Sequence, residues 1–103
     1  ISSMQNMFYL CSNFNDSGIT LWNVSNITNM SNMFAFASSF NQDISGWDVS
    51  NVFAMSGMFL NATSFNQDLS GWCVTLIPSL PFNFDTGATS WLLPKPIWGT
   101  CPP

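Results

Sequence analysis

The chain has 103 residues, a length that suits a single domain. Hydrophobic residues make up 47% of it, but only 6% are charged: five acidic residues, the lysine Lys95 and no histidine. One cation cannot neutralise a phosphate backbone or an anionic membrane surface, so nucleic-acid binding and a basic membrane patch are excluded. No apolar run reaches the roughly 18 residues of a membrane span, so we also expect no membrane insertion.

An internal repeat dominates the chain from its first residues. Residues 1–6 read as a partial repeat, and we interpret the chain as the mature or trimmed product of a longer precursor. Three repeats follow at 7–32, 33–57 and 58–79, each opening on a Met-Phe pair. The first is one residue longer because Asn-Asp-Ser-Gly replaces a polar Asn-Gln-Asp turn. A period of this length predicts a solenoid, in which each repeat packs on its neighbours.

Aromatic residues recur in three columns of the aligned repeats. We expect these columns to form the core, since aromatic residues at such spacing are more often buried than exposed. The columns are Phe8, Phe34 and Phe59; Phe14, Phe40 and Phe65; and Trp22, Trp47 and Trp72.

The spacing of apolar residues changes within each repeat. Met55, Met58, Ala62 and Phe65 follow helical spacing and predict a short α- or 3₁₀-helix, whereas Trp47-Asp-Val alternates like a short strand. One strand and one helix per 25-residue rung predict an α/β, leucine-rich-repeat-like solenoid with short parallel strands. A β-solenoid is the alternative.

The strings SSFNQDISGWDVSNV and TSFNQDLSGW, with AMSGMF after the first, resemble the BspA-type leucine-rich-repeat surface proteins. That family includes Mycoplasma lipoprotein-type sequences of unknown function. The resemblance extends over essentially the whole chain and implies an extracellular, surface-associated protein. It supplies no catalytic residues.

Residues 80–103 break the repeat with prolines and are predicted to form an irregular C-terminal cap. A disulfide between Cys73 and Cys101 would tie the cap to the last regular repeat and stabilise it by roughly 3–4 kcal/mol, with two free thiols as the alternative. Trp91 and Trp98 are the candidates for an exposed assembly surface. Cys11 aligns with alanines, which indicates a small buried side chain or else a disulfide to another repeat or chain.

Polar residues supply two further candidate features. Five asparagines lie in Asn-x-Ser/Thr sequons and are candidate N-glycosylation sites if the chain is secreted by a eukaryote: Asn15, Asn23, Asn26, Asn29 and Asn61. Asp43 and Asp68 align one repeat apart, and we expect each carboxylate to accept N–H groups of its own turn rather than to share a Ca²⁺ ion.

These observations predict a secreted protein of the extracellular surface that is not an enzyme and has no cofactor or metal. The first hypothesis is a structural protein that forms a homopolymer, stacking head-to-tail into a fibre or surface layer. The alternative is an adhesion module that binds a protein or glycan on a host surface.

Overall fold

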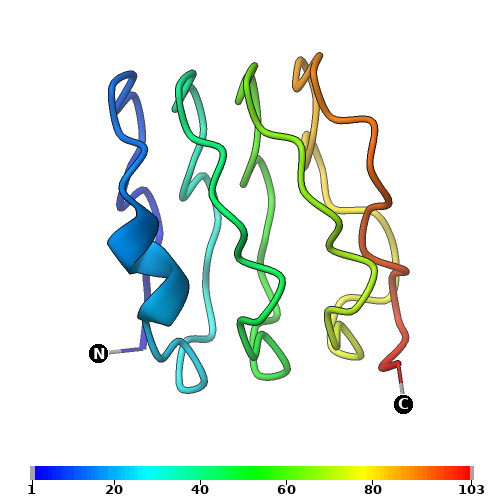
Figure 1. Cartoon of the computed structure of the whole chain (residues 1–103). Coiled ribbons are helices and arrows are strands. Elements are labelled where there is room, and N and C mark those ends of the chain that lie inside the picture. Colours follow the sequence, from blue (N-terminus) through cyan, green and yellow to red (C-terminus); the bar gives the residue numbers. More distant parts are fainter. Residues whose placement is uncertain (1, 103) are drawn as a thin grey trace.

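The computed structural model describes residues 2–102, and in it the chain winds through four coils that lie side by side (Figure 1). Backbone hydrogen bonds between equivalent residues define the repeat of the coils: the Thr28 N–H donates to the Ser2 carbonyl, and the Phe53 N–H donates to the Thr28 carbonyl. We therefore number the coils 1 (2–27), 2 (28–52), 3 (53–78) and 4 (79–102). The contact between two successive coils is called a joint below.

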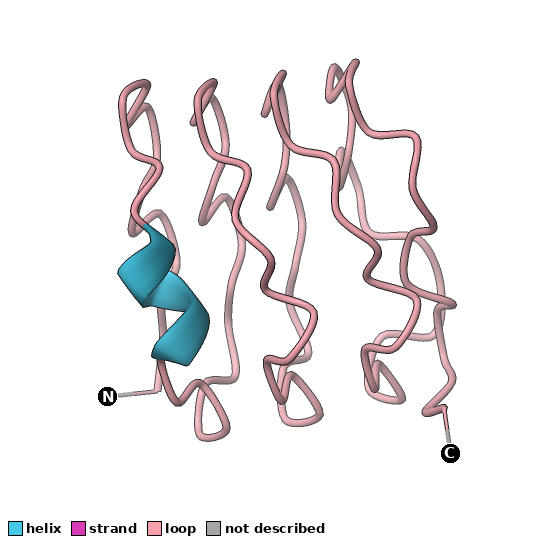
Figure 2. Cartoon of the chain, in the orientation of Figure 1, coloured by secondary structure: helices cyan, strands magenta, loops and turns pink. Residues whose placement is uncertain are grey.

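Regular secondary structure is almost absent from the described residues (Figure 2). The 3₁₀-helix η1, Ser17–Leu21, lies in coil 1 and has Asp16 as its N-cap, whose carboxylate accepts the Gly18 N–H at 2.8 Å. It forms in the segment where the first repeat carries its extra residue. Two isolated parallel bridges, Ser3 with Asn29 and Asn29 with Ala54, replace a sheet.

The predicted leucine-rich-repeat-like solenoid of strands and helices is therefore wrong. Over Met55–Phe65 the helical spacing arises from successive turns, because Met58, Ala62 and Phe65 each donate to the carbonyl three residues earlier. Gly57 and Asn61 adopt φ values of 65° and 54°, which interrupt a right-handed helix. The N–H groups between the turns donate to the next coil and are not available for an i−4 carbonyl.

The short strand predicted at Trp47–Val49 is also absent, and with it the β-solenoid alternative. Trp47 and Val49 do point inward, being 5% and 0% exposed, so the alternation of inward and outward residues is real. However, the Trp47 N–H closes a turn to Ile44, and the Asp48 carboxylate accepts the Ser50 N–H at 3.0 Å. The backbone hydrogen bonds of residues 47–49 stay within the coil, so no ladder between strands forms here.

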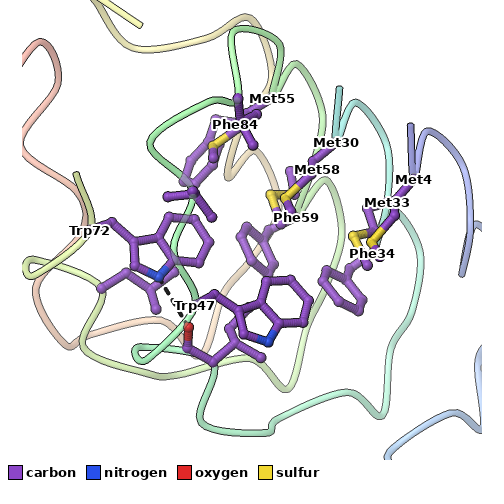
Figure 3. Packing of buried hydrophobic residues seen from close by; sticks show 14 of the residues in the cluster. Met4, Met30, Met33, Phe34, Trp47, Met55, Met58, Phe59, Trp72 and Phe84 are labelled. Atoms are coloured by element: carbon purple, nitrogen blue, oxygen red, sulfur yellow. Dashed lines mark hydrogen bonds between the residues drawn. The ribbon is translucent and has the colours of Figure 1, made fainter. Parts of the chain in front are cut away.

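The core is a set of columns that run through the stack (Figure 3). Phenylalanine rings of successive coils stack almost parallel, with centroids 5.6 Å apart for Phe34 and Phe59 and also for Phe40 and Phe65. The indole N–H groups of Trp47 and Trp72 donate to the Ile19 and Ile44 carbonyls of the preceding coil. Each tryptophan therefore fills the core and satisfies its polar atom at once.

The predicted cap, 80–103, continues the winding as coil 4 in its described part. The N–H groups of Phe59 and Asn61 donate to the carbonyls of Phe84 and Thr86 at 2.8 and 2.7 Å. Asn83 and Gly87 repeat the left-handed backbone that Gly57 and Asn61 have in coil 3. By this pairing of hydrogen bonds, Asp85 is the counterpart of Phe8, Phe34 and Phe59.

Left-handed residues of neighbouring coils also contact one another. A Cβ atom on Gly57 would overlap the side-chain oxygen of Asn32, and one on Gly87 would overlap that of Asn61. Each asparagine therefore lies directly against a glycine of the next coil.

Candidate functional site: the joints and the two ends of the stack

An asparagine ladder holds the joints together on one side of the stack. The Asn41 N–H donates to the Asn15 Oδ1 atom, and the Asn66 N–H donates to the Asn41 Oδ1 atom, both at 2.9 Å. The Gln42 and Gln67 amides reinforce the two contacts at 2.8 and 2.9 Å. We call this set of contacts the ladder, and it recurs because each repeat carries Phe-Asn or Phe-Asn-Gln-Asp at the same place.

The ladder ends in coil 4. The Asn66 Oδ1 atom accepts the N–H groups of Leu92 and Leu93 at 2.8 and 2.9 Å, so coil 4 receives the ladder. Leu92 occupies the position of the ladder asparagines and has no acceptor atom in its side chain. A further coil could not be bound to coil 4 by the same contact.

Coil 1 presents an apolar face on its side away from coil 2, here called the N-terminal face. Trp22 is 41% exposed, whereas its column partners Trp47 and Trp72 are 5% and 1% exposed. Phe8 and Phe14 are only partly buried on the core. The prediction that all three aromatic columns are core is thus wrong for Trp22, because a coil on each side is needed to bury this position.

A hollow opens beside Trp22 on coil 1. It has a volume of about 130 Å³ and is lined by Phe14, Asp16, Gly18, Ile19 and Trp22. The counterpart of Trp22 in the next coil, Trp47, donates its indole N–H to the Ile19 carbonyl. Trp22 itself has no such acceptor among residues 2–102, which leaves this edge of coil 1 incomplete.

Coil 4 closes its aromatic column in a different way. Trp91 and Phe84 contact the Phe59 ring edge-on, at interplanar angles of 75° and 79°, and end the parallel stack. The Asp85 carboxylate pairs with the Lys95 ammonium at 3.0 Å, and Lys95 lies 5.4 Å from the centre of the Trp91 ring.

The two cap tryptophans do not provide the exposed surface that the sequence predicts. Trp91 is only 4% exposed, and its indole N–H donates to the Gln67 carbonyl at 2.9 Å. Trp98 is half-buried with its ring edge against Phe84, at a centroid distance of 4.8 Å. The exposed apolar side chains of coil 4 are leucines, an isoleucine and a phenylalanine instead.

The cysteines divide into a bonded pair and a free thiol. Cys73 and Cys101 form a disulfide across 28 residues, which joins coil 3 to coil 4. Cys11 is free and exposed, although Ala37 and Ala62 in the same column are 0% exposed. The small buried side chain expected at this column is therefore found in the interior coils and not in coil 1.

The sequon asparagines have different environments. Asn15, Asn23 and Asn26 are exposed, while Asn29 and Asn61 are half-buried. The Asn15 side chain belongs to the ladder, and the Asn23 side chain accepts the Ser25 N–H at 3.0 Å.

The aspartates lie in tight turns on the exposed surface. Asp43 and Asp68 each accept the N–H group of the serine two residues later at 3.0 Å, as does Asp48. Hydrogen bonds from the Ser50 and Ser70 hydroxyls, and then from their N–H groups, hold the pKa values of Asp48 and Asp68 below the ordinary range. Among residues 2–102, no group of His, Cys, Asp and Glu side chains is arranged to hold a metal ion.

Sequence reasoning missed the ladder and the ion pair of coil 4. The ladder did have a signal in the repeated Phe-Asn-Gln-Asp string, but that string by itself predicts only a turn. The pairing of Asp85 with Lys95 had no signal beyond the scarcity of charge.

Comparison with protein families identifies a match over most of the chain. Residues 1–90 match the family described as "Mycoplasma protein of unknown function, DUF285". No curated protein and no solved structure matches the chain. Within residues 2–102, none of the helical structure is long and apolar enough to cross a membrane.

Proposed function

This chain belongs to the DUF285 family of Mycoplasma proteins of unknown function, and we propose that it is a non-catalytic structural protein of the extracellular surface that assembles end to end with its own copies. One observation carries the proposal. Ten of the twelve exposed large apolar side chains among residues 2–102 lie in the two end coils. They are Met7, Tyr9, Leu10, Leu21 and Trp22 in coil 1, and Leu80, Phe82, Leu92, Leu93 and Ile97 in coil 4.

Exposed apolar surface of this kind is typical of contact sites. Each square ångström removed from water contributes roughly 25 cal/mol, so covering both ends would favour association. Charge repulsion opposes association only weakly here, because 6% of the residues are charged and the net charge is −4. Two different ends that fit one another give a head-to-tail contact, which builds a filament when its rotation does not close into a ring.

An extracellular location fits the same proposal. The Cys73–Cys101 disulfide joins two coils of the stack. Disulfides of this structural kind persist in oxidising surroundings and are rare in the cytosol.

A binding or adhesion module is the second candidate, because two exposed apolar side chains lie away from the ends. Phe53 and Leu76 of coil 3 are 61% and 51% exposed. In this function the side of coil 3 would contact a protein or glycan on another surface, and the end coils would not be needed for it.

Sedimentation velocity over a wide range of protein concentration tests the two candidates. A matched set of Leu→Lys variants places one charge at each end and one at the side: Leu10→Lys, Leu92→Lys and Leu76→Lys. We expect the unaltered chain and Leu76→Lys to form growing assemblies, and the two end variants to stay small. A monomeric chain at every concentration would contradict the assembly function, and equal effects of all three variants would contradict the role of the ends.

A further inference from the structure

We infer that the joint between two copies repeats the joint inside the chain, with the N–H groups of residues 83, 85 and 87 in one copy donating to the carbonyls of residues 5, 7 and 9 in the next. The inference rests on the proposed assembly function. It goes further by naming the backbone groups that meet and the direction in which copies stack.

The same strip of backbone joins every pair of neighbouring coils. In each joint, three N–H groups at alternate residues of one coil donate to three carbonyls at alternate residues of the next. The distances are 3.0, 2.9 and 2.9 Å from Asn6, Phe8 and Leu10; 2.9, 2.9 and 2.7 Å from Asn32, Phe34 and Phe36; and 2.9, 2.8 and 2.7 Å from Gly57, Phe59 and Asn61. The acceptors are Ser31, Met33 and Ala35; Ser56, Met58 and Leu60; and Phe82, Phe84 and Thr86.

Coil 4 presents the next set of donors. By register, Asn83, Asp85 and Gly87 are the counterparts of the donor residues in coils 1 to 3. Their N–H groups have no acceptor among residues 2–102. The backbone is also in the donor conformation, since Asn83 and Gly87 have φ values of 56° and 77° where Asn6 and Leu10 have 61° and 62°. Pro81 lies at the position before this set and has no N–H group, so the strip begins at Asn83.

Coil 1 presents the matching acceptors. Gln5, Met7 and Tyr9 are the counterparts of Ser31, Met33 and Ala35. Their carbonyls accept no hydrogen bond within the described residues. Unpaired N–H and C=O groups at an edge are a template for pairing with another chain.

One strip carries only N–H donors and the other carries only carbonyl acceptors. We therefore expect a second copy of the chain to bind in one orientation. Two N-terminal faces would oppose carbonyls to carbonyls, and two coil 4 faces would oppose N–H groups to N–H groups. Only coil 4 against coil 1 pairs three donors with three acceptors at the same spacing. The contact is therefore head-to-tail and continues the joint that the chain already makes three times.

The joint between copies lacks one contact that the interior joints have. Leu92 holds the position of the ladder asparagines, so it offers no acceptor to the Asn15 N–H of the next copy. We therefore expect the joint between copies to open on dilution while the coils within each copy stay folded.

Cysteine cross-linking tests this register directly. Cys11, Ala37, Ala62 and Ala88 occupy one column, so Ala88 of one copy lies beside Cys11 of the next. Neighbouring hydrogen-bonded chains lie about 4.8 Å apart, within the roughly 4.4–6.8 Å between Cα atoms that a disulfide spans. Ala88→Cys therefore supplies the partner for the free thiol of Cys11, and each copy then carries one thiol at each end.

We expect mild oxidation of Ala88→Cys to give a ladder of covalent multimers on a non-reducing gel. Mass spectrometry should find the peptide in which Cys11 is bonded to the thiol introduced at position 88. Ala88→Cys combined with Cys11→Ser should stop at dimers. Thr63→Cys, which places an exposed thiol on coil 3, should couple far more slowly.

The outcomes separate the register from the proposed function. Assembly in sedimentation without a link between Cys11 and position 88 would overturn this register but leave the proposed function intact. Absence of any assembly would overturn both.

Discussion

Replacement of Asn41 by alanine removes the central acceptor of the ladder. The Asn41 Oδ1 atom accepts the Asn66 N–H and the Gln67 amide, each at 2.9 Å. The Asn41 N–H stays bonded to Asn15 in the variant, so only the joint between coils 2 and 3 loses contacts. The side chain is exposed, and its removal therefore leaves no cavity in the core.

The two lost hydrogen bonds set the size of the effect. Each contributes about 1 kcal/mol net, so the free energy of unfolding should fall by about 2 kcal/mol. For a domain of this length, 1 kcal/mol shifts the Tm by roughly 4–8 °C, which gives a decrease of roughly 8–16 °C. The m-value of urea unfolding should not change, since the same surface is exposed on unfolding.

Urea and thermal unfolding, followed by tryptophan fluorescence and near-ultraviolet circular dichroism, measure the change. Asn41→Asp keeps two acceptor oxygens and should lose less than half as much stability. Asn13→Ala is the matched control, because Asn13 is exposed and makes no hydrogen bond among residues 2–102. If Asn41→Ala loses no more stability than Asn13→Ala, the ladder does not hold the joints and the reasoning fails.

Three further predictions concern the core, the disulfide and the acidic turns. Phe40→Ala removes a ring that is 0% exposed and should cost about 3–5 kcal/mol, whereas Phe53→Ala, at 61% exposure, should cost about 0.5 kcal/mol in the same urea experiment. Cys73→Ser opens a 28-residue crosslink and should lower the free energy of unfolding by about 3.5 kcal/mol; an unchanged Tm would contradict this. The pKa of Asp48 is lower in the folded chain than in the unfolded one, so its stabilisation is present above about pH 4 and is lost as the pH falls through the folded value. Ser50→Ala should therefore weaken the dependence of Tm on pH below that range, and identical pH profiles would disprove the role of this turn.

The repeat could be predicted from the sequence because equivalent positions of successive repeats carry the same residue type. Met33 and Met58, or Phe40 and Phe65, align without any knowledge of their surroundings, and all four are buried. The local conformation could not be predicted in this way. The helical spacing at Met55–Phe65 is compatible with either a helix or a row of turns. The left-handed backbone at Gly57 and Asn61 is incompatible with a helix, so the segment forms a row of turns.

The candidate site was harder to predict because it depends on position in the stack. Trp22 and Trp47 occur in similar sequences, yet only Trp47 has a coil on each side and is buried. The role of Asn41 depends in the same way on the Asn66 N–H, 25 residues later, and on the Asn15 Oδ1 atom, 26 residues earlier. A repeat alignment shows which residues are equivalent, but it does not show which coil is an end.

The contact of Asn32 with Gly57, and of Asn61 with Gly87, bears on how such a chain can change over evolutionary time. Tandem repeats are often regarded as modules that duplication and recombination can shuffle freely. Here Asn32 and Asn61, in the orientations they adopt, leave room only for a glycine at the facing position of the next coil, because a Cβ atom on Gly57 or Gly87 would overlap the amide oxygen. The restriction belongs to these two pairs, since Asn6 of coil 1 is followed by Asn32 in coil 2. Exchange of coils 2 and 3 would break this match even though the aromatic columns would remain aligned. Insertion of new coils should therefore be tolerated best where it keeps Asn32 beside Gly57 and Asn61 beside Gly87.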